Sequence, residues 1–314
     1  MKWGLNHVIP YGRTFMSKSK LKSAQYSINE CVKNIKGYSF ASKADMRHML
    51  NRCIKDLHEQ GYKLGHLNGL KPKHIYILIE LWKAQGKSTA TIKNYMAKLR
   101  KVGVLLDKPQ LVKPGNDTYQ INRRSYAPTY NKAIHQTDFS KCADPLIRLS
   151  LEAQSLFGLR REESIKLIIS EAWQGNNLKI KPSWTKGGIG RTLDITNEEQ
   201  RQWLSNAMQQ IPQGLSLIPV DKTYKQHLGH YQKQIKLLGL SKCHGLRHAY
   251  AQRRYRELTQ QFDSNGKGLA CPINGGLSSR QLKGIEREWD RRAREIISRE
   301  LGHARIAITK IYLA

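Results

Sequence analysis

Acidic residues are scarce in this chain of 314 residues, where 24 Asp and Glu stand against 54 Lys and Arg. The resulting formal charge of +30 is far larger than solubility requires and points to a polyanionic partner. From Lys71 to Lys113, ten Lys or Arg stand against Glu80 and Asp107, and such groups bind phosphates with release of counterions. A merely basic surface is the alternative, but the bias persists along most of the chain.

Cysteines, long apolar runs and acidic clusters are also scarce. The five cysteines are widely spaced and form no Cys-x-x-Cys pair, so neither a disulfide framework nor a zinc site is indicated. No apolar run approaches a membrane span, and the start lacks the apolar segment of a secretory signal. No Asp and Glu cluster has the spacing of a two-metal site. We expect a cytoplasmic protein that acts on nucleic acid without a membrane, a metal or another cofactor.

The first half of the chain has the periodicity of amphipathic helices. Of four apolar stripes, the third begins at Pro72, and Ser88 or Thr89 can cap the fourth. We expect an N-terminal extension over residues 1–20 and a compact helical bundle over residues 21–110. The fourth helix directs basic side chains largely outward, as DNA contacts or as solvated surface; they are Lys93, Lys98, Arg100 and Lys101.

Residues 111–138 change character, because prolines, a glycine and several Asn, Thr and Tyr replace the helical period. This composition predicts an interdomain linker, in which Arg123 and Arg124 are further candidates for phosphate contact. The remaining residues, 139–314, are mixed. They include predicted helices at 145–157, 222–238, 244–258 and 282–300 and predicted strands at 177–181 and 191–195. The fold class is therefore mainly α with a small β-sheet.

Between the two predicted strands lies Thr185-Lys186-Gly187-Gly188. Gly187, Gly188 and Gly190 permit a tight hairpin that would present Lys186 at its end. Lys181 is the nearby competitor for the same role.

Three more short motifs surround this hairpin in sequence order. The first is Gly158-Leu159-Arg160 with Glu163, the second is His244-Gly245-Leu246-Arg247-His248, and the third is Leu301-Gly302-His303 with Tyr312. A tyrosine near the end of a chain is usually an exposed ring or a packing anchor. Together with the hairpin lysine, however, this succession resembles the tyrosine recombinase (phage integrase) family of site-specific DNA recombinases.

The resemblance implies that the bundle is a core-binding domain that clamps DNA and that residues 139–314 form a mixed α+β catalytic domain. It also implies cleavage and rejoining of DNA strands through a 3′-phosphotyrosine intermediate. Tyr312 would be the nucleophile, with Arg160, Arg247 and His303 as donors to the phosphate, His244 as the proton acceptor and Lys186 as the general acid. Glu163 would orient an arginine, and His248 would brace the site by hydrogen bonding.

The implied partner is double-stranded DNA with inverted half-sites, bound by a homodimer and paired in a homotetramer. Accessory DNA-bending or directionality proteins and a nucleoid-associated location would accompany the integrase of a mobile element. One alternative is a type IB topoisomerase, which relaxes supercoils with similar chemistry. Another is a catalytically inactive architectural DNA-binding protein, although no reactive group of the family is missing here.

Two features depart from the family. The separation of His244 from His303 is longer than usual, with an insertion at about 259–284 that contains loop-like runs. It either decorates the surface or contacts DNA or another protomer, and we favour a role in assembly. In addition, only Leu313 and Ala314 follow Tyr312, which puts assembly through an exchanged C-terminal tail in doubt.

Overall fold

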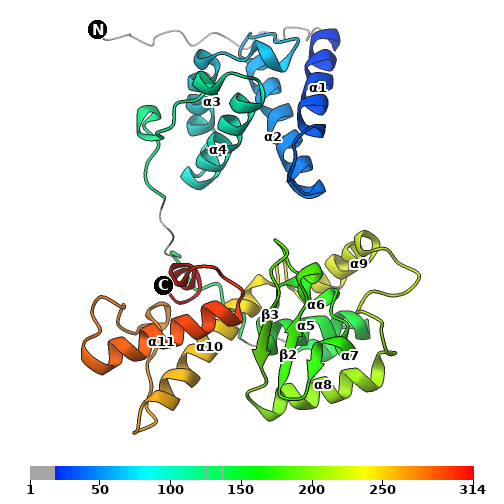
Figure 1. The fold of residues 1–314 in the computed structure, drawn as a ribbon, viewed down its shortest axis with the longest axis vertical. Coiled ribbons are helices and arrows are strands. Elements are labelled where there is room, and N and C mark those ends of the chain that lie inside the picture. The colour runs from blue at the N-terminus through cyan, green and yellow to red at the C-terminus, as the bar shows by residue number, and fades with distance from the viewer. Residues whose placement is uncertain (1–17, 125, 127, 136–137) are drawn as a thin grey trace. The chain divides into compact units, whose positions relative to one another are not determined.

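The computed structural model describes residues 18–124, 126, 128–135 and 138–314. The chain divides into two compact units at residue 124 (Figure 1). The fold class predicted from the sequence, mainly α with a small sheet, is confirmed. Among the described residues, no helix is both long enough and apolar enough to cross a membrane.

The first unit is built from the four predicted helices, α1 (Lys18–Lys33), α2 (Phe40–Glu59), α3 (Pro72–Ala84) and α4 (Thr89–Leu105). The side chains of Ser39 and Ser88 cap α2 and α4 by accepting backbone N–H groups, as expected of serine at this position. Their apolar faces meet in one core that includes Leu50, Trp82 and Met96. Most of the predicted N-terminal extension lies outside the described residues.

The predicted linker, 111–138, is shorter in the structure. Its first part belongs to the first unit, because Leu111, Val112, Tyr119 and Ile121 are buried in the same core as the four helices. These residues lie in and around short 3₁₀ turns at 109–111 and 117–119. Their buried apolar residues do not recur with a helical period, so the sequence pattern did not reveal that they belong to the core. The later part joins the second unit, where the Ile134 N–H donates to the Gly245 carbonyl.

The second unit surrounds a three-stranded antiparallel sheet in the order β1-β2-β3. The strands are β1 (Trp173–Gln174), β2 (Asn177–Ile180) and β3 (Arg191–Asp194). Leu178 of β2 pairs with Trp173 and Leu193. The sequence predicted β2 and β3 but missed β1, which is too short to carry a period. The helices preceding α9 are α5 (Pro145–Phe157), α6 (Arg161–Ile165), α7 (Ile169–Ala172) and α8 (Glu198–Gln210).

Four more helices follow α8 in the sequence. They are α9 (Tyr224–Leu237), α10 (His244–Phe262), α11 (Gly284–Glu300) and the short α12 (Lys310–Leu313). Helices α10 and α11 pack against each other, and α12 contacts α10 (Figure 1). Because α10 runs beyond its predicted end to Phe262, the segment between α10 and α11 is 263–283, with one 3₁₀ turn, η6 (Pro272–Asn274).

Candidate active site

Arg160 is positioned by a sharp turn after α5. Gly158 adopts φ +62°, and a Cβ on it would lie 2.4 Å from the ring of Tyr250, so only glycine fits there. The turn makes Arg160 the residue that precedes α6. Its backbone N–H donates to Glu163 Oε2 at 2.8 Å, and its guanidinium donates to Glu163 Oε1 at 2.6 Å.

Glu163 holds a second arginine that sequence reasoning missed. Its fully buried carboxylate accepts two hydrogen bonds from Arg191, at 3.1 and 2.7 Å, while Arg191 Nε donates to the Glu300 carbonyl. Burial alone would raise the pKa of Glu163, but the hydrogen bonds and charges of Arg191 and Arg160 outweigh it and lower this pKa to about 2. Arg191 begins a predicted strand, and nothing local distinguishes it from the many other basic residues.

Replacing Glu163 by Gln is expected to lower the free energy of unfolding at pH 7 by about 3 kcal/mol, because Arg191 keeps a buried charge without a counterion. The folded-state pKa of about 2 lies below the ordinary 4.5. The carboxylate therefore stabilises the fold above about pH 5, and this contribution is lost as the pH falls toward 2. The free energies of unfolding of the parent and of Glu163→Gln, measured with urea, should accordingly differ much less at pH 3 than at pH 7.

The matched control is Glu162→Gln. Glu162 is 39% exposed and pairs with Lys166 on the surface of the same helix, so its loss should change the free energy of unfolding by at most about 1 kcal/mol. If the free energies of unfolding of Glu163→Gln and the parent differ by the same amount at pH 3 and pH 7, the stabilisation does not come from the ionised carboxylate.

Arg247 is almost fully buried, with 1% of its surface exposed. Its guanidinium donates to the carbonyls of Gly158 and Leu301 and, through Nε, to the hydroxyl of Tyr312 at 3.3 Å. Its Nη2 lies 3.5 Å from His303 Nε2. Burial lowers the pKa of Arg247 to about 10, so the group remains charged at neutral pH. Arg247 therefore joins three of the sequence motifs through one cation.

Tyr312 lies among these groups with only 4% of its surface exposed. Its ring centroid is 4.7 Å from that of His248, 5.6 Å from His303 and 5.9 Å from His244. Within the described part of the chain, the hydrogen bond to its hydroxyl comes from Arg247. His248, expected to brace the site by hydrogen bonding, contacts Tyr312 ring to ring.

The surroundings of the three imidazoles favour their neutral forms. Burial, followed by the charges of Arg247 and Arg160, lowers the pKa of His303 to about 4. Burial and the neighbouring His244 lower the pKa of His248 to about 4. The pKa of His244, an exposed residue, is also lowered, by burial and then by Arg247. Neutral imidazoles beside a phenol can accept its proton or a hydrogen bond from it.

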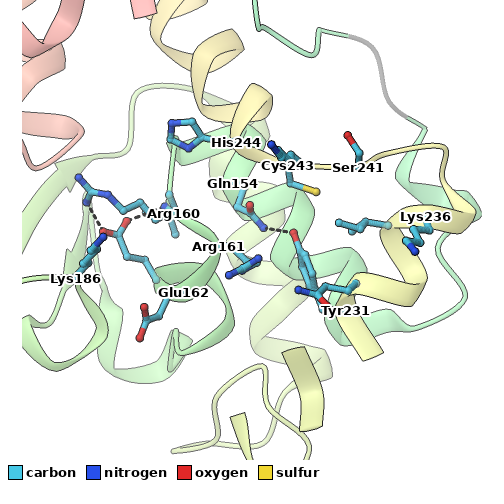
Figure 2. Close-up of a pocket in the computed structure, with 15 residues that line it drawn as sticks. Gln154, Arg160, Arg161, Glu162, Lys186, Tyr231, Lys236, Ser241, Cys243 and His244 are labelled. Atoms are coloured by element: carbon cyan, nitrogen blue, oxygen red, sulfur yellow. Dashed lines mark hydrogen bonds and ion pairs between the residues drawn. The ribbon is translucent and has the colours of Figure 1, made fainter. Parts of the chain in front are cut away.

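A pocket of about 450 Å³ opens beside this cluster. Arg160, Glu163, Lys186 and His244 contribute to its lining, together with further basic groups from α6 and α9 and the turn before α10. Figure 2 shows Arg160 and Lys186 at one end and Lys236 and Ser241 at the other. Arg247, His303 and Tyr312 are not among the lining residues. An anion in the pocket can therefore contact three of the predicted catalytic residues, Arg160, Lys186 and His244.

Lys186 and Lys181 differ in their surroundings. Lys186 is exposed in the connection between β2 and β3 and lines the pocket. Lys181 forms an ion pair with Glu171 at 2.5 Å and lies over the Trp184 ring. Of these two lysines, Lys186 is therefore the one that a ligand in the pocket can contact.

Lys98 and Arg100, both predicted to contact DNA, bond to other residues of the first unit. Lys98 pairs with Asp45 at 2.6 Å. Arg100 donates to the Lys113 carbonyl and to Asn116 Oδ1, which fixes the segment expected to be linker. Of the other residues predicted to contact DNA, Lys93 is half-buried, and the exposed ones are Lys101, Arg123 and Arg124. Among the described residues, no group of three His, Cys, Asp or Glu could hold a metal ion.

Two family models match the chain. A family model described as "Phage integrase, N-terminal" matches residues 24–112, and one described as "Integrase" matches residues 120–253. Together they match well over half of the chain. Curated protein sequences gave no match.

Solved structures share the fold at low sequence identity. A lambda integrase dimer bound to a COC′ core site has a TM-score of 0.52 at 13% identity, over 86% of this chain and 77% of that chain. The Tn1549 transposon integrase in complex with transposon right end DNA has a TM-score of 0.51 at 13% identity, over 93% and 94%. The same integrase with a circular intermediate DNA has a TM-score of 0.51 at 12% identity, over 93% and 94%.

Proposed function

The chain belongs to the phage integrase family of tyrosine recombinases, which are site-specific DNA recombinases, and we propose that Tyr312 is its nucleophile. The observation that carries this proposal is the 3.3 Å hydrogen bond from Arg247 to the Tyr312 hydroxyl, with the imidazoles of three histidines close to the same ring. All of these groups come from one chain, so a protomer can assemble the site with its own tyrosine.

In the proposed reaction the Tyr312 oxygen attacks a DNA phosphorus and the bond to the 5′ oxygen breaks. The proton of the phenol passes to neutral His244, which assists because a phenol ionises only near pH 10. Arg160 and Arg247 stabilise the charge that builds on the phosphate oxygens, with His303 as a further donor.

Lys186 gives a proton to the departing 5′ oxygen. The products are a 3′-phosphotyrosine and a free 5′ hydroxyl. The covalent bond conserves the energy of the phosphodiester, so a second 5′ hydroxyl can attack it and restore the DNA backbone. These steps account for every bond and proton without another reactant.

The substrate is double-stranded DNA, and the surplus of thirty positive charges supplies the phosphate contacts. Lys101, Arg123 and Arg124 are exposed for such contacts in the first unit. We further propose binding of inverted half-sites by a dimer, pairing of two sites in a tetramer and integration of a mobile element, with accessory DNA-bending proteins. The structural similarity to the Tn1549 transposon integrase supports the mobile-element assignment.

The test begins with a duplex enriched from a randomised pool by binding to the protein, hereafter the selected duplex. Nicks placed at successive positions let the short 5′-hydroxyl fragment escape after cleavage, which traps the covalent adduct. An adduct on the selected duplex and none on a scrambled duplex is the expected result. Relaxation of supercoiled plasmids without site preference would instead indicate topoisomerase activity.

Lys186→Ala is expected to slow cleavage of the selected duplex by about a hundredfold or more, the scale of one general acid. A substrate with sulfur in place of the 5′ leaving oxygen should restore most of the rate, because a thiolate leaves without protonation. Single-turnover cleavage of the two substrates measures this rescue.

Lys181→Ala is the matched control and should behave like the parent, since Lys181 is paired with Glu171. His244→Ala should gain much less from the sulfur substrate than Lys186→Ala. Equal rescue of those two variants would remove the distinction between acid and base.

A further inference from the structure

The insertion between α10 and α11 is held by bonds within itself and to α10, where Thr259 Oγ1 accepts the Leu269 N–H at 2.9 Å. The Asp263 carboxylate accepts the backbone N–H groups of Asn265, Lys267 and Gly268, at 2.9 to 3.1 Å. Gly276 packs so closely that a Cβ on it would lie 1.8 Å from the Ala270 carbonyl oxygen. These contacts brace residues 263–276 of the segment.

Three side-chain amides connect this segment to the backbone of the nucleophile. Gln252 of α10 is 4% exposed, and its Nε2 donates to the Tyr312 carbonyl at 3.1 Å. The Gln252 Oε1 accepts from Asn274 of the insertion at 3.2 Å and from Asn131 at 3.2 Å. Asn131 in turn donates to Asn274 Oδ1 at 2.8 Å and accepts from Gln252 Nε2 at 2.9 Å. We call Asn131, Gln252 and Asn274 the amide cluster.

Apolar contacts accompany the amide cluster. Leu269, Cys271 and Ile273 of the insertion belong to the same hydrophobic cluster as Tyr312 and Leu313. The η6 turn, which carries Asn274, packs against α12. The insertion therefore contacts the tyrosine helix through both polar and apolar groups.

Helix α12 needs such support because it is only four residues long. Isolated helices of this length are unstable in water, since nucleation costs more than so few hydrogen bonds return. The last four carbonyls of a helix also lack intrahelical donors. The Tyr312 carbonyl is one of them, and Gln252 supplies its donor.

We propose that Gln252 is a positioning residue for the nucleophile and that the insertion, through Asn274, holds the Tyr312 helix of its own chain. This role rests on the proposed function of Tyr312. It differs from the assembly role that the sequence favoured, because the contacts of the insertion lead to the active site of the same chain.

Amide hydrogen exchange, measured without DNA, tests whether Gln252 and the insertion hold the Tyr312 helix. Gln252→Met keeps the volume of the side chain but removes its amide, and Asn274→Ala changes a residue at the surface. Each substitution should raise the rate of amide hydrogen exchange in the peptide 306–314 by about fivefold or more, the scale of one net hydrogen bond. Exchange in β2 and β3 should stay unchanged in the same proteins.

Two matched controls separate this effect from general destabilisation. Gln200 is 3% exposed, and its Nε2 donates to a backbone carbonyl, that of Leu156, at 2.9 Å, so Gln200→Met removes an equivalent buried amide elsewhere. Asn265→Ala removes another exposed asparagine from the same insertion. Neither control should raise exchange of peptide 306–314.

Cleavage and binding of the nicked selected duplex complete the test. Gln252→Met and Asn274→Ala should slow single-turnover cleavage by about fivefold or more, with the Kd for the duplex unchanged and the controls at the parental rate. Parental exchange of peptide 306–314 in both variants would overturn the positioning role, whatever the nucleophile is. A Kd that weakens as much as cleavage slows would also overturn it. If Tyr312→Phe still forms the adduct, the proposed nucleophile fails, and that result is independent of the exchange measurement.

Discussion

Replacing Tyr312 by Phe is expected to abolish the covalent adduct on the nicked selected duplex. The substitution removes the oxygen proposed to attack phosphorus and keeps the ring that packs between the imidazoles of His248 and His303. Binding should stay within about twofold of the parent, because phosphate contacts dominate affinity for DNA. Denaturing gels measure the adduct, and gel retention measures binding.

The control for this experiment is Tyr255→Phe. Tyr255 is a fully buried phenol of α10 that donates to Asp290 at 2.6 Å, and burial followed by its contact with Asp290 raises its pKa. This variant should form the adduct at the parental yield. Adduct formation by Tyr312→Phe at the parental yield would assign the nucleophile elsewhere, with Tyr250 and Tyr255 as the next candidates.

Arg160→Ala and Arg247→Ala should each slow cleavage by about a hundred- to a thousandfold, the loss typical of one transition-state donor. The two variants should differ in stability. Arg247 bridges the carbonyls of Gly158 and Leu301 from a buried position, so its loss leaves both without their donor. Arg160 is 27% exposed in its side chain and pairs with Glu163. A clear drop in melting temperature is therefore expected for Arg247→Ala only.

Arg201→Ala serves as the control for loss of one positive charge in the same unit. Arg201 bonds to Asn176 away from the pocket, and its variant should cleave at the parental rate. If Arg160→Ala cleaves within a few-fold of Arg201→Ala, the donor role assigned to Arg160 is wrong. Single-turnover cleavage and thermal unfolding, measured on the same preparations, separate the chemical loss from the structural one.

Much of the fold is encoded locally and was predictable from the sequence. The helices of the first unit follow from apolar periods and, for α4, from the capping residue Ser88. The strands β2 and β3 follow from the glycine-rich segment between them. The four motifs, read in order, predicted the family and the candidate residues Arg160, Lys186, His244, Arg247, His303 and Tyr312. Each of these signals lies within a few residues along the chain.

What the sequence did not reveal depends on residues that are distant along the chain. Arg191 bonds to a carbonyl 109 positions away, and Gln252 bonds to one 60 positions away, so no local pattern marks either. The intramolecular partners of Lys98 and Arg100 were hidden for the same reason. The burial of residues 111–121 was hidden because irregular turns bury apolar groups without a period.

The sequence by itself determined the class of fold, the order of the motifs and the chemistry that these groups can perform. Only the tertiary structure decided that Arg247 joins three motifs and that Glu163 holds two arginines. The tertiary structure alone also places the insertion against the helix that carries Tyr312 of the same chain. The physical reason is that helices and turns arise from neighbouring residues, whereas a buried charge or amide takes its partner from whichever segment packs beside it.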